Sequence, residues 1–112
     1  MDKEKDPDGL DQHDLGAKLD AGKSLPWLLI AGFPTALNEV VEVGTIGARK
    51  YTPNGWRHVK DGENRYMEAF ARHMLKLASG EELDEQTLCH HKAHMIWNLL
   101  ASLEIELNEN KS

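Results

Sequence analysis

Apolar side chains recur at helical spacing over three stretches of the chain, and strand-like alternation of useful length does not occur. Residues 63–79 place four large side chains at i, i+4, i+8 and i+11, which are Tyr66, Phe70, Met74 and Leu77. Gly80 follows in the position where a glycine commonly ends a helix. The pattern therefore predicts an amphipathic helix that ends near residue 79.

Two more helices are expected on either side of this one. The signal "FPT" precedes apolar positions at helical spacing in "ALNEVVEVGTIGARKY". Gly44 and Gly47 in the last turns of this segment indicate either an early end or the close approach of another backbone. The third helix is expected to begin near Thr87 and to run to about Leu107.

The segment before the first helix is expected to be mostly loop. Residues 1–14 are acidic and nearly free of apolar side chains, which predicts a disordered tail. A glycine-punctuated loop follows and leads into a short apolar piece around residues 27–30. The expected fold is all-α, with three main helices and a long N-terminal loop in one domain over residues 15–107. Residues 108–112 would form a flexible C-terminal tail.

Length and charge narrow the classes of function. A chain of 112 residues leaves little surface for a deep private pocket, so a helical homo-oligomer is expected. The formal net charge is −6, with 13 basic and 19 acidic residues, which argues against binding a DNA or RNA polymer. The acidic residues gather at the two ends. The middle of the chain is locally basic and could bind a small phosphorylated ligand.

Other features lead us to expect a cytoplasmic protein. The single cysteine, Cys89, excludes an internal disulfide. The N-terminus is acidic and lacks the apolar run of a signal peptide. The longest apolar stretch, "LPWLLIAGF", is too short to span a bilayer, so no membrane partner is expected.

The third helix carries an unusual polar stripe. His91, His94 and Asn98 lie at i, i+3 and i+7, and apolar neighbours indicate that the stripe is at least partly buried. A buried polar group without a hydrogen-bond partner costs about 1–3 kcal/mol. Three such groups on one helix are more than packing requires, so we favour a functional use. The plainer alternative is a helix–helix interface in an accessory subunit.

Two other positions could contribute to a metal site. Glu39 and Glu42 are i, i+3 neighbours on the first helix, and paired carboxylates suit a hard cation such as Mg²⁺. On spacing alone, a solvated helix face is the better explanation of the pair. His73 borders the apolar stripe of the second helix, where a histidine is usually a hydrogen-bonded structural residue.

Basic and aromatic side chains alternate in the loop regions. Phosphate oxygens could be held by Arg49, Lys50, Arg65 and Arg72. A flat ring could stack on Tyr51, Trp56 or Tyr66. This mixture suits a nucleotide, although an aromatic-packed loop with solvated charges would look the same. The "HExxH" and "GxxxxGK[ST]" motifs are absent.

Taken in order, these residues resemble a phage-associated family, the N-terminal domain of dATP/dGTP diphosphohydrolases. The resemblance rests on "GAKLDAGK", "EVVEVGTIGARKY", "NGW", "RY", "RHML", "GEELD" and "HKAHMIWNLL", and covers residues 16 to 104. It implies kinship with MazG-like all-α pyrophosphohydrolases, which use carboxylate-bound Mg²⁺ to split a nucleoside triphosphate into monophosphate and pyrophosphate. Glu39 and Glu42 match the first acidic motif of those enzymes. At the second motif this chain has His91 and His94, which shifts the preference towards Mn²⁺.

If the protein is an enzyme, each candidate residue has an expected role. A divalent cation, Mg²⁺ or Mn²⁺, would be held by Glu39, Glu42, His73 and His94. Developing charge would be stabilised by Lys50, Arg65 or Arg72, and His91 would transfer a proton. Lys18, Asp20 and Lys23 would close over the ligand. The remaining contacts to substrate are assigned to Tyr51, Trp56, Tyr66 and Asn98.

The expected function is thus metal-dependent hydrolysis of a purine (deoxy)nucleoside triphosphate in the cytoplasm, that of the host cell if a phage encodes the protein. The competing hypothesis is a non-catalytic binder that sequesters a nucleotide signal of host defence. The missing second acidic motif favours the binder, whereas the Glu39/Glu42 pair favours the enzyme.

Overall fold

The computed structural model describes residues 3–109, and the chain divides into two compact units, Met1–Gly32 and Phe33–Ser112. Every regular element within residues 3–109 is helical, and one isolated β-bridge joins Leu83 and His90. The all-α prediction is confirmed. Among residues 3–109, none of the helices combines the length and the hydropathy that a membrane span requires.

The first unit consists of turns followed by one short helix. Asp6 organises the turns, because its carboxylate accepts the backbone N–H groups of Asp8 at 2.7 Å and Lys18 at 2.7 Å. The apolar piece expected around residues 27–30 forms helix α1, Pro26–Gly32. Its large side chains are exposed, including Trp27 at 70%. Residues 1–2 of the expected acidic tail lie outside the described residues.

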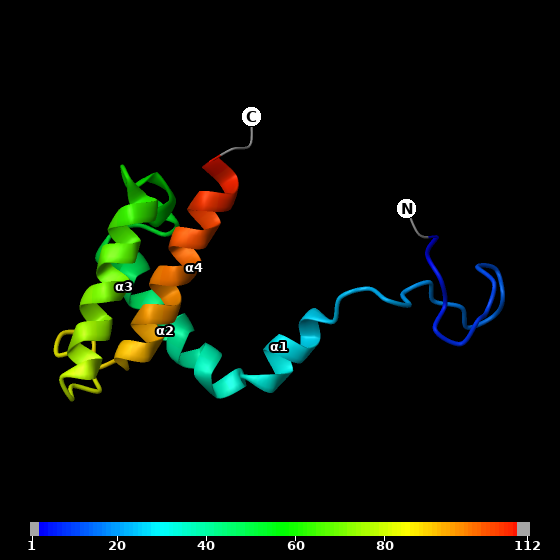
Figure 1. Cartoon of the computed structure of the whole chain (residues 1–112), viewed down its shortest axis with the longest axis horizontal. Coiled ribbons are helices and arrows are strands. Elements are labelled where there is room, and N and C mark those ends of the chain that lie inside the picture. The colour runs from blue at the N-terminus through cyan, green and yellow to red at the C-terminus, as the bar shows by residue number, and fades with distance from the viewer. Residues whose placement is uncertain (1–2, 110–112) are drawn as a thin grey trace. The chain divides into compact units, whose positions relative to one another are not determined.

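The second unit holds three long helices and a short 3-10 turn. These elements are α2 (Pro34–Lys50), η1 (Gly55–His58), α3 (Gly62–Ala78) and α4 (His91–Glu109). Helix α4 packs against both α2 and α3, and Figure 1 shows α3 and α4 side by side. Residues 110–112 of the expected C-terminal tail lie beyond the described part of the chain, and residues 108–109 belong to α4.

Small side chains and one tryptophan form the centre of this unit. Val40 and Val43 of α2 are buried against Cys89 and Ala93, with Trp97 packed beside them. Trp97 also makes edge-to-face contacts with two aromatic rings, Trp56 at 6.0 Å and Tyr66 at 5.6 Å between centroids. The Tyr66 hydroxyl donates to the Trp56 carbonyl at 3.2 Å. These contacts tie η1 and α3 to the middle of α4.

Two expected details differ from the structure. Helix α4 begins at His91 rather than near Thr87, because residues 84–87 form a turn and Leu88 has a left-handed φ of 61°. Helix α2 does not end early and continues through both glycines to Lys50. Gly44 permits a close approach, as predicted, but the neighbour is a side chain: a Cβ there would lie 2.9 Å from Trp97 Nε1.

The two glycines of α2 provide a matched test of this packing. We expect Gly44→Ala to lower the free energy of unfolding by about 1–3 kcal/mol, because the added methyl group displaces the Trp97 ring. A Cβ atom at Gly47 would meet no heavy atom within 4 Å, so Gly47→Ala should raise stability by about 0.5–1 kcal/mol through helix propensity. Urea denaturation measures both values. Equal effects of the two substitutions would contradict this account of Gly44.

Candidate functional site

Three side chains from separate segments converge at one end of the α3–α4 pair. His73 comes from α3, Asp84 from the connecting loop and His94 from α4. Each offers one ligand atom, and the three atoms all lie within 4.8 Å of one another. Two imidazoles and a carboxylate are donor groups that suit a divalent cation.

The end of α3 directs the connecting loop towards α4. Gly80 adopts a positive φ of 101°, and its N–H donates to the Leu77 carbonyl at 3.0 Å. The N–H of Glu81 donates to the Lys76 carbonyl at 3.1 Å, which completes a Schellman motif. The Glu81 carboxylate then reaches His91 Nε2, with 2.5 Å between the two atoms.

A second turn fixes the carboxylate of Asp84. Its Oδ2 atom accepts hydrogen bonds from the backbone N–H of Gln86 at 3.1 Å and from Thr87, through the N–H at 2.9 Å and the hydroxyl at 3.1 Å. The Asp84 backbone pairs with Leu88 and Cys89 at 2.8 Å each. Asp84 is 8% exposed, and its orientation is therefore set by the turn rather than by solvent.

The histidines form a connected group. The rings of His73 and His94 are stacked, with centroids 4.3 Å apart and an interplanar angle of 9°. His73 Nδ1 lies 2.8 Å from His91 Nδ1, and His94 Nε2 lies 2.7 Å from the Thr87 hydroxyl oxygen. His91 has no exposed surface. Each of the three rings is thus held by at least one polar contact.

The surroundings favour neutral imidazoles and an ionised carboxylate. Burial, together with the nearby His94 and His91, lowers the pKa of His73 to about 4. Burial also lowers the pKa of His94, although the Asp84 charge opposes this shift. For Asp84, burial alone would raise the pKa, but the hydrogen bonds from Thr87 and Gln86 and the neighbouring His94 lower it on balance. Deprotonated ligands are the forms that bind a metal ion.

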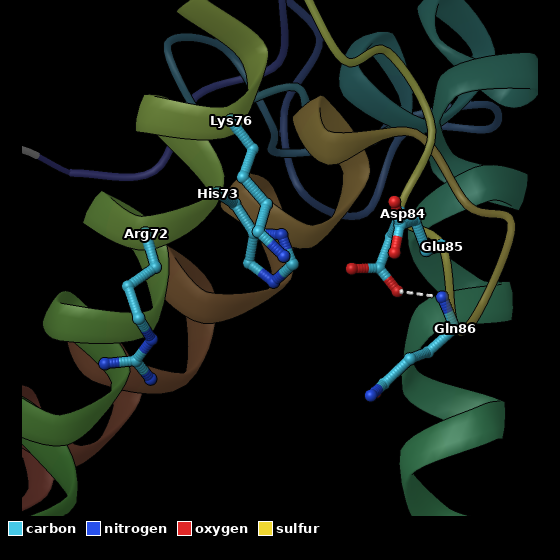
Figure 2. Close-up of a pocket in the computed structure, with 6 residues that line it drawn as sticks. All are labelled: Arg72, His73, Lys76, Asp84, Glu85 and Gln86. Carbon is cyan, nitrogen blue, oxygen red and sulfur yellow. Dashed lines mark hydrogen bonds between the residues drawn. The ribbon is translucent and has the colours of Figure 1, made fainter. Parts of the chain in front are cut away.

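A polar cavity of about 260 Å³ opens beside these ligands. Figure 2 shows the six residues that line it: Arg72, His73, Lys76, Asp84, Glu85 and Gln86. The imidazole of His73 and the carboxylate of Asp84 face each other across it, and the Asp84 carboxylate also accepts the Gln86 N–H. Two cationic side chains of α3, Arg72 and Lys76, could bind phosphate oxygens there.

The structure brings together part of the metal site predicted from the sequence. His73 and His94 are adjacent, and Arg72 lines the same cavity. Glu39 and Glu42 are exposed on α2, and neither belongs to the group of ligand atoms found within residues 3–109. Their assignment as ligands stays a prediction. The polar stripe of α4 is buried as expected at His91 and at Asn98, which is 6% exposed.

Other predicted contacts to substrate have structural partners. Trp56 and Tyr66 are half-buried in the aromatic packing around Trp97. The Asn98 amide donates to the His94 carbonyl at 2.8 Å, and the Arg65 guanidinium donates to the Lys60 carbonyl at 3.1 Å. These contacts give each residue a role in the fold. The roles that the sequence predicts for these residues in binding substrate stay predictions.

The remaining predicted residues lie at exposed positions. Lys50 lies over the ring of Tyr51, with its Nζ 5.3 Å from the ring centroid, and Tyr51 is 73% exposed. Lys18, Asp20 and Lys23 belong to the Met1–Gly32 unit. Their role as a lid stays a prediction.

Sequence reasoning assigned no role in the site to Glu81, Asp84 and Thr87, which lie between the second predicted helix and the start of the third. One signal was present. The spacing Asp-x-x-Thr in "LDEQTL" is typical of a turn in which an aspartate caps the following backbone N–H groups. That signal predicts a fixed carboxylate before α4, but it does not indicate which histidines lie beside it.

The lowered histidine pKa values predict a pH dependence of stability in the metal-free protein. Protons bind His73 and His94 more weakly in the folded chain than in the unfolded chain, where the usual value is 6.5. The free energy of unfolding should therefore fall as the pH decreases from about 6.5 towards about 4. Urea denaturation in the presence of a chelator, at several pH values, measures this slope.

Two variants show whether the slope belongs to the cluster. The double variant His73→Gln/His94→Gln should have a flatter dependence, whereas His58→Gln, at an exposed position outside the cluster, should retain the original one. A wild-type stability that stays constant between pH 7 and pH 5 would contradict the argument.

Sequence similarity identifies the family. Residues 13–112 match the family described as dATP/dGTP diphosphohydrolase, N-terminal. A protein named dATP/dGTP diphosphohydrolase, from Salmonella phage PMBT28, is 36% identical over 85 residues, which make up 76% of this chain and 28% of that protein. The chain thus spans less than a third of the length of this relative, and no solved structure matches it. The resemblance seen in the sequence is confirmed, and the chain belongs to the dATP/dGTP diphosphohydrolase N-terminal family.

Proposed function

We propose that this protein hydrolyses a purine deoxynucleoside triphosphate to the monophosphate and pyrophosphate, with a divalent cation held by His73, Asp84 and His94. One observation carries the proposal: these three ligands converge beside a cavity that also presents Arg72 and Lys76. The name of the Salmonella phage relative supports the choice of substrate. That relative is much longer, so the activity of its other parts does not transfer to this chain.

The residues around the cavity suit hydrolysis of a phosphoanhydride bond. A divalent cation bound there would neutralise phosphate charge and activate water. Arg72 and Lys76 would hold the phosphate oxygens, since charge-assisted hydrogen bonds to phosphate are strong. Water adds across the bond between the α- and β-phosphates, and the proton that it loses needs an acceptor. The Glu85 carboxylate lines the same cavity at an exposed position and is placed to accept this proton.

The role proposed for His91 changes from proton transfer to positioning. Its side chain is wholly buried, and both ring nitrogens already have partners in Glu81 and His73. A substrate in the cavity would therefore meet His73 and not His91. We assign His91 to holding the His73 ring in place.

Removal of the ligands tests the enzymatic proposal. Incubation with dATP, dGTP and other triphosphates in the presence of Mg²⁺ or Mn²⁺, followed by chromatography, should show monophosphate and pyrophosphate. We expect Asp84→Asn and His94→Ala to lower turnover at least about 100-fold, because each removes a metal ligand. Glu68→Gln, which changes an exposed carboxylate of α3, should retain activity.

The same assay distinguishes this proposal from a metal site on α2 and from sequestration of an intact nucleotide. Loss of turnover in the double variant Glu39→Gln/Glu42→Gln, with full activity in His94→Ala, would move the site to α2. Intact nucleotide that is recovered only after the protein is heated would support sequestration instead of hydrolysis. One feature of the cavity supports sequestration: Arg72 and Lys76 could bind phosphates without any cleavage.

We also propose that the second unit pairs with a second copy of itself. The apolar side chains that are buried within residues 3–109 are all small: Val40, Val43, Cys89, Ala93 and Ala101. Meanwhile α3 and α4 share an apolar groove, lined by Met67, Ile96, Leu99, Leu100, Ser102, Leu103 and Glu106. A second copy related by a two-fold axis would cover this groove with the same two helices, as in a four-helix arrangement.

Light scattering after size-exclusion chromatography tests the pairing. The wild-type protein should elute with at least twice the monomer mass of 12.6 kDa. Leu100→Lys, in the groove, should shift the protein to the monomer, because it places a charge in the proposed interface. Leu75→Lys, at a position of α3 that is 71% exposed and outside the groove, should leave the mass unchanged. A monomeric wild-type protein would rule out the pairing.

A further inference from the structure

Two hydrogen-bond chains end at the candidate metal ligands, and each begins at a carboxylate. One runs from Glu81 through His91 to His73. The other runs from Asp84 through the Thr87 hydroxyl to His94. Because a carboxylate only accepts hydrogen bonds when ionised, each chain restricts where the protons of the next groups can lie.

The first chain determines the tautomer of His73. The Glu81 carboxylate lies 2.5 Å from His91 Nε2, so this nitrogen carries a proton. We take His91 as neutral, and in a neutral imidazole the other nitrogen is then an acceptor. His91 Nδ1 therefore accepts from His73 Nδ1–H across 2.8 Å. The lone pair of His73 is left on Nε2, the nitrogen on the opposite side of the ring.

The second chain determines the tautomer of His94. The Thr87 hydroxyl has one proton, which it donates to Asp84 Oδ2 at 3.1 Å. The hydroxyl oxygen can then only accept from His94 Nε2, which lies 2.7 Å away and therefore carries a proton. The lone pair of His94 is left on Nδ1. Every side-chain hydrogen bond that Asp84 makes in residues 3–109 uses Oδ2, so Oδ1 is also available.

We propose that these chains prepare a site for a transition-metal dication of the Mn²⁺ to Zn²⁺ series in preference to Mg²⁺, bound by His73 Nε2, His94 Nδ1 and Asp84 Oδ1. The two rings are stacked in parallel without the ion, so binding turns one of them until both lone pairs meet at the metal. Glu81 and His91 are positioning residues that set its affinity. The inference deepens the proposed function and rests on the metal site named there. It adds the class of metal, the ligand atoms and two residues that no substrate would touch.

The donor atoms determine the preference. Neutral imidazole nitrogen suits transition metals, whereas Mg²⁺ binds oxygen ligands and keeps several waters. Two nitrogens and one carboxylate oxygen from the protein leave coordination positions for water and for phosphate oxygens. The cavity beside Arg72 and Lys76 is where those oxygens would enter.

A substitution of Glu81 is the most direct test of the first hydrogen-bond chain. Its side chain is 31% exposed, so the folded state should tolerate Glu81→Gln. Unlike the carboxylate, a glutamine amide can donate as well as accept, so the His91 proton is no longer confined to Nε2 and can move to Nδ1. His91 would then donate to His73 Nδ1, and the His73 proton would move to Nε2, the proposed ligand atom. The substitution therefore weakens metal binding without altering any ligand.

The experiment uses the metal-stripped full chain. Co²⁺ is added while its visible absorption bands are recorded, and Mn²⁺, Zn²⁺ and Mg²⁺ are then tested as competitors. We expect a 1:1 complex with ligand-field bands that Zn²⁺ displaces at comparable concentration, that Mn²⁺ displaces only in excess, and that millimolar Mg²⁺ does not displace. Glu81→Gln should weaken Co²⁺ binding by about 10- to 100-fold. Glu82→Gln, the neighbouring exposed carboxylate, should leave it unchanged.

A second readout reports the tautomers directly. Long-range ¹H–¹⁵N spectra of the metal-free protein should show His73 protonated on Nδ1 and His94 protonated on Nε2, and Glu81→Gln should populate the form of His73 that is protonated on Nε2. Opposite tautomers in the wild-type protein, equal affinity for Mg²⁺ and Co²⁺, or equal affinities of Glu81→Gln and Glu82→Gln would each overturn the inference.

These outcomes are separable from the fate of the proposed function. A protein that binds Co²⁺ as expected but leaves every triphosphate intact would support the metal site and contradict the proposed hydrolase activity. A protein that cleaves triphosphates with Mg²⁺ but gives no Co²⁺ complex would support the hydrolase activity and contradict the transition-metal site.

Discussion

The complete burial of the His91 side chain is the constraint on which the site depends. A polar ring without exposed surface must find hydrogen-bond partners for both nitrogens, or the folded state loses about 1–3 kcal/mol for each one left unpaired. The two partners come from different segments, Glu81 after the end of α3 and His73 within it. Satisfying one buried ring therefore fixes the α3–α4 connection and the orientation of a candidate ligand at the same time.

The fold brings these groups together with few large side chains. Trp97 is packed against α2, η1 and α3, three residues beyond His94 on the same helix. Gly44 makes room for its ring. The same tryptophan that joins the elements of the unit thus determines the rotation of α4, and with it the direction in which His94 and Asn98 point.

Helical periodicity predicts only those features of the structure that depend on spacing within one segment of the chain. It predicted α3, the all-α fold and the burial of His91 and Asn98, because each depends on spacing within one segment. The start of α4 and the role of Asp84 depend on a turn with a left-handed residue at Leu88, which has no periodicity. The pairing of His73 with His94 depends on how α3 and α4 pack, and spacing within either helix does not contain that information.

The Schellman motif at the end of α3 has a consequence for the evolution of chain length. Glu81 follows Gly80 directly, and Asp84 lies three residues later. Both carboxylates are therefore a fixed number of residues from a turn whose hydrogen bonds set its length. An inserted or deleted residue between Gly80 and His91 would move one carboxylate out of register with its histidine. The loop that links α2 to η1 contains no such pair, so natural variation in length should accumulate there and avoid the α3–α4 connection.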